Sequence, residues 1–156
     1  MGQGWGVRRV LLSVESLLSS CLVGGSRNTL RRQVGGDSKY EVEFGYSRAV
    51  RVGSIVLVAA TSGSDQPEPE LAPDTYAQAK RAIQKINEAL ESLGFGLDDV
   101  VRLRVFAKRE LGLEDFKRAY REFFADIRPA LSLVYVSGFP SDKTILEIEA
   151  EALKDG

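Results

Sequence analysis

The sequence predicts an α+β fold in which one mixed β-sheet carries two helices on a single face. Six segments have the composition or the alternation of β-strands, two have the periodicity of amphipathic helices, and their order is β-β-β-α-β-α-β-β. Two helices can cover only one face of such a sheet, so the other face stays open. Because that face would be partly apolar, we expect it to pack against other copies of the chain.

Residues 1–36 differ in composition from the remainder and are expected to precede a folded domain at 37–156. The segment is rich in Arg, Ser and Gly, and its apolar run at 10–23 is interrupted by Glu15. Three interpretations stay open: a disordered or non-native extension, a secretory or lipoprotein signal with Cys21 at its lipid-attachment position, and an organelle transit peptide. The run is too short and too polar for a membrane span, which needs roughly 20 apolar residues.

The first three strands are predicted at residues 40–44, 48–52 and 55–60. Residues 40–44 alternate apolar and charged side chains, as a half-buried strand does. The second and third segments are rich in β-branched residues and are separated by Gly53-Ser54, which predicts a type II′ hairpin turn. A loop with several prolines at 62–73 ends the third strand.

A long helix is predicted to begin at Asp74 or Thr75. Thr75 and Gln78 have the spacing of a capping box. Gly94 is suited to the left-handed position that follows a helix. A single apolar stripe runs along the helix at Ala79, Ile83, Ile86, Leu90 and Leu93.

The second half of the chain predicts a strand at 100–107, a helix at 113–124, and strands at 131–136 and 145–153. Pro129 cannot continue the helix. The last strand alternates strictly, with Leu146, Ile148, Ala150 and Ala152 on one face and Glu147, Glu149 and Glu151 on the other. The open face of the sheet would carry either Leu131, Leu133 and Tyr135 or Ser132, Val134 and Val136.

Composition excludes several classes of function. The chain has no histidine and one cysteine, which excludes Ser-His-Asp and Cys-His catalysis, histidine-ligated zinc and an internal disulfide framework. Residues 33–156 hold 16 basic and 21 acidic side chains, so a general nucleic-acid partner is not expected. The excess of arginine over lysine, with few Cys and Met, suggests a thermophilic source. Any chemistry must use carboxylates, Arg, Lys, Tyr, hydroxyls or backbone groups.

Several short segments, taken in order, resemble the YjgF/RidA family of reactive intermediate deaminases over roughly residues 40–152. The order of the segments is more specific than any one of them. They are GYSRAV at 45–50, VGSIVLV at 52–58, DVVR at 99–102, YREFF at 120–124, RPALS at 128–132 and EIEA at 147–150.

The resemblance implies a chorismate-mutase-like fold and a homotrimer whose sheets line the inside, with ligand clefts between subunits. It implies hydrolytic deamination of reactive enamines and imines, the 2-imino acids, to 2-keto acids. The ligand would be a small molecule such as an imino or keto acid. No cofactor, metal, membrane or nucleic-acid partner is implied, and the expected location is the cytoplasm.

The resemblance also assigns site residues. Tyr46 matches a tyrosine that lines the pocket, and Glu147 matches the catalytic glutamate that handles water. Ala130 and Leu131 fall where the family has Pro-Ala-Arg, and that arginine would hold the substrate carboxylate. Arg128 is a candidate replacement for the missing cation.

Several features depart from the family pattern. The second helix is shorter than in the family, and the asparagine expected within it has no clear match. Leu131 replaces the substrate-binding arginine, which favours a branch of the family that lacks it and predicts a more apolar cleft. The Ser-Gly pair expected at the end of the third strand is Ala59-Ala60.

Other interpretations of the same residues stay open. The glutamates at 147, 149 and 151 could instead form an acidic ladder that Arg102 and Arg104 partly neutralise. The chain could be a non-catalytic module that binds small ligands or proteins. Ribonuclease activity is less favoured, because the domain is acidic and has no histidine acid–base pair.

Overall fold

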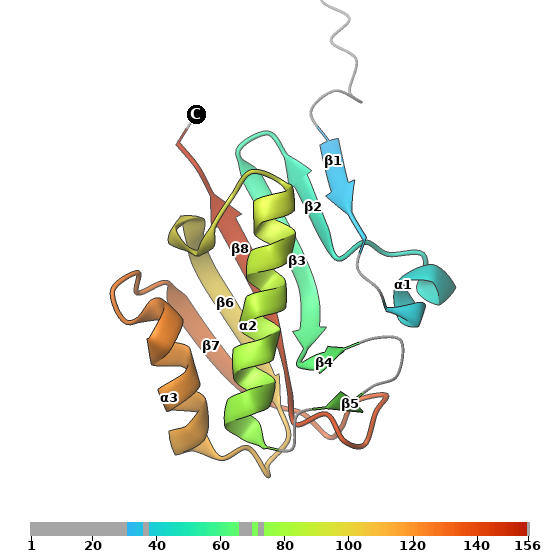
Figure 1. Cartoon of the computed structure of the whole chain (residues 1–156), viewed down its shortest axis with the longest axis vertical. Helices are drawn as coiled ribbons and strands as arrows, with labels where there is room; N and C mark the ends of the chain where they lie inside the picture. Colours follow the sequence, from blue (N-terminus) through green and yellow to red (C-terminus); the bar gives the residue numbers. More distant parts are fainter. Residues whose placement is uncertain (1–30, 36–37, 66–69, 72–73, 156) are drawn as a thin grey trace, which may run out of the picture.

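The structure, a computed structural model, describes residues 31–35, 38–65, 70–71 and 74–155 (Figure 1). Its strands are β1 (Arg31–Val34), β2 (Ala49–Val52), β3 (Ile55–Ser62), β4 (Ser64–Asp65), β5 (Glu70–Leu71), β6 (Val100–Ala107), β7 (Ala130–Tyr135) and β8 (Leu146–Leu153). Its helices are α1 (Lys39–Phe44), α2 (Thr75–Ser92), α3 (Leu113–Phe124) and the short 3-10 helix η2 (Leu97–Asp99). No helix within the described ranges is long and apolar enough to cross a membrane.

The main sheet has six strands in the order β1-β2-β3-β8-β6-β7. All neighbouring strands are antiparallel except β6 and β7, which are parallel and are joined through α3. The predicted mixed sheet of an α+β fold is therefore confirmed. A separate two-stranded pair, β4 with β5, lies within the predicted loop at 62–73.

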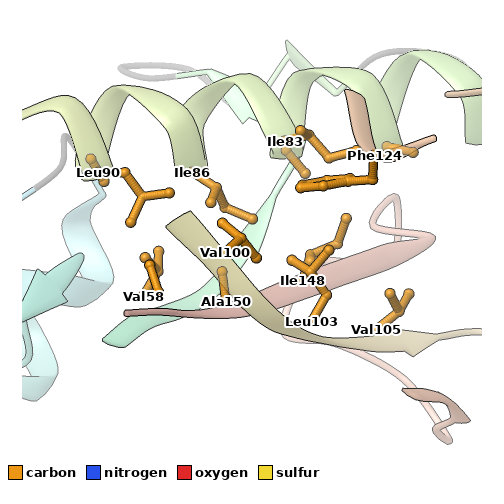
Figure 2. Packing of buried hydrophobic residues seen from close by; sticks show 14 of the residues in the cluster. Val58, Ile83, Ile86, Leu90, Val100, Leu103, Val105, Phe124, Ile148 and Ala150 are labelled. Atoms are coloured by element: carbon orange, nitrogen blue, oxygen red, sulfur yellow. The ribbon is translucent and has the colours of Figure 1, made fainter. Parts of the chain in front are cut away.

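The two long helices, α2 and α3, cover the same face of the sheet, and no helix of the described residues lies over the other face (Figure 1). The core lies between these layers (Figure 2). Ile83, Ile86 and Leu90 of α2 point at the sheet, and Phe124 of α3 lies beside Ile83. From β8 the core receives the predicted set, Leu146, Ile148, Ala150 and Ala152.

The long helix is confirmed, but its N-terminus is capped differently from the prediction. Asp74 is the cap, and its Oδ1 accepts a hydrogen bond from Ala77 N at 2.8 Å. Thr75 is already helical, and its hydroxyl accepts from Gly112 N at 3.0 Å. The Gln78 side chain bonds the loop before β8. The prediction of a capping box is therefore wrong, because the side chains of Thr75 and Gln78 bond residues elsewhere in the fold instead of the first turn of the helix.

The C-terminus of α2 follows the prediction. Gly94 has a φ of 80°, the left-handed conformation expected there. Phe95 N donates to Leu90 O and Gly94 N to Glu91 O, both at 2.9 Å, which is a Schellman motif.

The segment predicted as the first strand, 40–44, is instead the helix α1. Ser38 caps it by accepting a hydrogen bond from Tyr40 N at 3.3 Å, and Gly45 ends it with a φ of 72°. Serine and glycine therefore bracket one short turn of helix. The alternation that suggests a strand has another cause: the helix buries the charged Glu41 and exposes apolar side chains, with Val42 86% and Phe44 78% exposed.

The first strand of the sheet comes from the segment assigned to the N-terminal extension. Arg31–Val34 form β1, which pairs antiparallel with β2 at the sheet edge. The sheet therefore includes residues 31–34, which precede the predicted start of the domain at residue 37. Residues 1–30, which include Cys21 and the apolar run at 10–23, lie outside the described residues.

The β2–β3 hairpin is as predicted, but β3 extends further. Val52 and Ile55 pair across the turn, and Gly53 alone of the two turn residues has a positive φ, 60°, as a type II′ turn requires. The register shifts between Val58 and Thr61, which marks a bulge. The strand continues to Ser62, so a Ser-Gly pair does end the third strand, two residues after the predicted end.

Candidate functional site

The open face of the sheet has three zones along its strands. An apolar zone includes Val52, Ile55, Leu57 and Leu153, which are about half exposed. A charged zone follows in the middle of β6 and β8. At the far end a row runs across four strands, formed by Ser62, Glu147, Phe106 and Val134. We call this last region the Glu147 end of the sheet.

The charged zone is the predicted acidic ladder. Arg104 contacts Glu149 at 3.4 Å and Glu151 at 2.8 Å, and Arg102 lies 4.0 Å from Glu151. Among the ion pairs of the described residues, none includes Glu147. The ladder interpretation therefore holds for two of the three glutamates, and Glu147 is distinct from them.

Glu147 lies between an alcohol and an aromatic ring. Ser62 is its cross-strand neighbour on β3, and Phe106 is its neighbour on β6. Burial raises the pKa of the Glu147 carboxyl above its ordinary value, Arg48 opposes the rise, and Glu149 adds to it. A carboxyl with a raised pKa and an apolar neighbour is suited to proton transfer close to neutral pH.

Arg48 is a buried cation at this end of the sheet. Its Nη2 lies 2.7 Å from Glu41 Oε1, and Nη1 donates to Ala60 O at 3.0 Å and to Thr61 Oγ1 at 2.8 Å. Only 8% and 5% of the Arg48 and Glu41 side chains are exposed. The guanidinium thus joins α1, the start of β2 and the bulge of β3.

Tyr46 is placed at the same end of the sheet. It follows α1, its backbone N donates to Glu41 O at 3.2 Å, and β2 begins three residues later. Ala59 N donates to Arg48 O, so the chain before β2 runs alongside the bulge of β3. The backbone of Tyr46 therefore lies at the end of the sheet where Glu147 is, and its side chain is 38% exposed.

The other predicted site residues lie elsewhere. Leu131 pairs with Leu103, whose side chain is in the core, so Leu131 is on the helix side of the sheet edge. Its backbone is three residues along and two strands across from Glu147, a separation of about 14 Å. Ala130 is on the open face but in the row of Glu151.

Arg128 is further still from Glu147, because it precedes β7 at the Ala130 end. It is exposed and has a φ of 54°, the only positive φ at a non-glycine residue in the described ranges. Its N donates to Phe124 O at 3.0 Å. Within one chain the five predicted residues therefore form two groups, Tyr46 with Glu147 and Arg128 with Ala130 and Leu131.

Sequence reasoning missed three residues of the Glu147 end: Ser62, Arg48 and Glu41. The Ser62-Gly63 pair is visible in the sequence, but the bulge in β3 moves the end of the strand two residues beyond the predicted position. The ion pair was not detectable, because α1 resembles a strand in sequence and gives no sign that a glutamate is buried.

The comparisons with known proteins place this geometry in a family. The sequence profile described as Endoribonuclease L-PSP matches residues 37–154. A RutC family protein of Pyrococcus abyssi is 35% identical over 111 residues, which span 70% of this chain and 87% of that protein. The 2-iminobutanoate/2-iminopropanoate deaminase of Salmonella typhimurium is 30% identical over 112 residues, 70% of this chain and 87% of that protein.

Solved structures agree with the sequence matches. The crystal structure of Rv2704 from Mycobacterium tuberculosis, a member of the YjgF/YER057c/UK114 family, has a TM-score of 0.73 and 35% identity. The match covers 80% of this chain and 99% of that chain. The mixed sheet, the two helices on one face and the profile match together show that the chain belongs to the YjgF/RidA family.

Proposed function

We propose that the protein hydrolyses small reactive imines of the 2-imino acid class to 2-keto acids, with Glu147 as the catalytic carboxylate. The observation that carries the proposal is the setting of Glu147: a partly buried carboxyl with a raised pKa, outside the ion-pair ladder and beside Ser62. A relative named as a deaminase of two such imino acids supports this choice of substrate.

The chemistry needs one group that first accepts and then donates a proton. The imine reacts as its cation, with its nitrogen already protonated. Water adds to the carbon of the C=N bond while the ionised Glu147 takes a proton from it, which gives a neutral carbinolamine. The protonated Glu147 returns this proton to nitrogen, the C–N bond breaks, and the hydroxyl proton passes through Glu147 to the departing ammonia, so that the products are a ketone and ammonium. A carboxyl whose pKa is raised toward the working pH performs both steps better than an ordinary one.

The proposed site is completed by a second copy of the chain, in a homotrimer. Within one chain Leu131 and Glu147 are about 14 Å apart and on opposite sides of the sheet, too far to hold one small ligand. The apolar zone of the open face and the exposed Val42 and Phe44 on α1 are surfaces that such a contact would cover.

The position where the resemblance expects an arginine holds Leu131, so this protein would bind the substrate carboxylate weakly or by another group. A substrate with an apolar side chain therefore fits better than a strongly anionic one. This residue also supports a second candidate, a trimer that binds a small ligand without turnover.

In the test, an amino-acid oxidase acting on alanine or leucine generates an imino acid in situ. Semicarbazide traps the imino acid, and the measured quantity is the rate of keto-acid formation in competition with this trapping. The expected result is faster keto-acid formation with the protein than without it, and loss of the increase in Glu147→Gln. Arg121→Gln, an exposed substitution on α3, is the matched control and should retain full activity. No acceleration by the wild-type chain would overturn the deaminase proposal and leave ligand binding.

A further inference from the structure

One buried cation at the Glu147 end has no role in the proposed reaction, and its surroundings are unusual. Arg48 and Glu41 form an ion pair that is nine-tenths buried, at a distance of 2.7 Å. Removing two charges from water is unfavourable, and an apolar pair of the same volume is often as stable. Such a pair is therefore weak grounds for stability and calls for another explanation.

The contacts of Arg48 show what the pair holds. Both Nη1 protons go to the bulge of β3, at Ala60 O and Thr61 Oγ1, and Thr61 Oγ1 in turn donates to Ala59 O at 2.7 Å. The residue after this bulge segment is Ser62, the direct neighbour of Glu147. The guanidinium thus fixes the stretch of β3 that leads into Ser62, whose backbone pairs with Glu147 and whose hydroxyl bonds that of Ser64 at 2.7 Å.

We propose that Arg48 is a positioning residue for Glu147: held by Glu41, it fixes the bulge of β3 that leads into Ser62, the cross-strand neighbour of Glu147. Glu41 controls how much of the Arg48 charge reaches Glu147, because it neutralises that charge from the other side. The consequence for catalysis rests on the proposed function, whereas the charge coupling can be measured without any turnover.

The charged groups that act on Glu147 come from two directions. Arg48 on the β2 side favours its ionised form, and Glu149 on the same strand disfavours it. The neighbouring strands contribute Ser62 and Phe106, which carry no charge. Each of the two charges has its own partner, Glu149 with Arg104 at 3.4 Å and Arg48 with Glu41 at 2.7 Å. The Arg48 pair is the one that also bonds the bulge of β3.

The experiment is a carboxyl carbon NMR titration of the full chain, with the Glu147 signal assigned by its loss in Glu147→Gln. Arg48→Met leaves the negative Glu41 and should raise the pKa of Glu147. Glu41→Gln frees the positive Arg48 and should lower it. A purely structural ion pair predicts the same loss of stability in both variants and no opposed shifts, so the opposite directions are the deciding result.

The matched control is Arg51→Met, the same substitution three residues along, where the guanidinium bonds Gly53 O and Leu93 O on the helix side. It should leave the pKa of Glu147 unchanged. If Arg48→Met does not fold, Glu41→Gln is compared with the neutral double variant Glu41→Gln/Arg48→Met, and the pKa must be lower in the single variant.

Shifts in the same direction, or none, would overturn the proposal. Opposed shifts in a chain that hydrolyses no imine would support the coupling and reject the deaminase function instead. Where the chain is active, the acid limb of its pH–rate profile should move with the measured pKa in each variant.

Discussion

Gly63 approaches the backbone of Gln78 so closely that a Cβ on Gly63 would lie 2.5 Å from the Gln78 carbonyl oxygen and 2.7 Å from its Cα. The end of β3 and the first turns of α2 therefore touch through backbone alone. Because Ser62 precedes this contact, the approach fixes the serine that neighbours Glu147.

Gly63→Ala should lower the free energy of unfolding by about 1–3 kcal/mol, the usual cost of forcing atoms into a packed contact. Chemical denaturation measures the change. Gly138→Ala is the control, because nothing lies within 4 Å of a Cβ there and its φ is not positive. Equal stabilities of the two variants would contradict the close approach.

Asp74→Ala should destabilise the protein by about 1 kcal/mol, because the first turn of α2 loses the acceptor for Ala77 N. Asp74→Asn keeps an acceptor and should retain most of the stability. Thermal unfolding of the three proteins provides the measurement. If alanine and asparagine behave alike, the carboxylate of Asp74 is not the cap.

Glu147→Gln should stabilise the fold at neutral pH and lose that advantage in acid. The folded-state pKa of Glu147 is raised by burial, so the folded protein binds this proton more tightly than the unfolded chain does. The stability contributed by the bound proton of Glu147 is present below the pKa that this carboxyl has in the unfolded chain, and it is lost as the pH rises through its pKa in the folded protein. Unfolding free energies across this range would show a flatter dependence for the variant, and a steeper one would contradict the sign.

Leu57→Glu should dissociate the proposed trimer. Leu57 is 54% exposed on the open face beside Glu151, and a second negative charge there would lose its hydration where the proposed contact covers this face. Sedimentation velocity on both proteins measures the mass. Leu113→Glu, at a residue 45% exposed on α3, is the control and should leave the assembly unchanged. A wild-type chain that sediments as a monomer would remove the basis for a shared site.

Leu131→Arg should increase the activity on anionic imino acids, by lowering KM more than it changes kcat. The new guanidinium would supply a bidentate partner for the substrate carboxylate. Because Leu131 and Glu147 are about 14 Å apart within one chain, the gain requires two copies. The double variant Leu57→Glu/Leu131→Arg should therefore lose the gain, and a gain that survives dissociation would show that the two residues act within one chain.

The elements that were predictable are those whose own residues carry the periodicity. The stripe of α2 and the alternation of β8 repeat over many residues, so each element is specified locally. α1 was not predictable in this way. Its six residues bury Glu41 and expose Val42 and Phe44, which reverses the usual pattern and imitates a strand.

The candidate site shows the same division. The sequence predicts that Glu147 lies on the open face, because β8 alternates strictly and its other face carries the core residues. Its separation from Glu149 and Glu151 could not be predicted, since it depends on which glutamates Arg104 reaches from the neighbouring strand. The grouping of Arg128, Ala130 and Leu131 away from Glu147 follows from the register of β6 with β7 and β8.

By itself the sequence determined the class of fold, the faces of the long elements and the absence of histidine chemistry, because these depend on composition and on short repeats along the chain. Only the tertiary structure decided that Arg48 meets Glu41, that β3 bulges to bring Ser62 beside Glu147, and that β1 comes from the N-terminal segment. Each of these depends on a contact between different elements or on one irregular step in a strand, and neither produces a periodic pattern in the sequence.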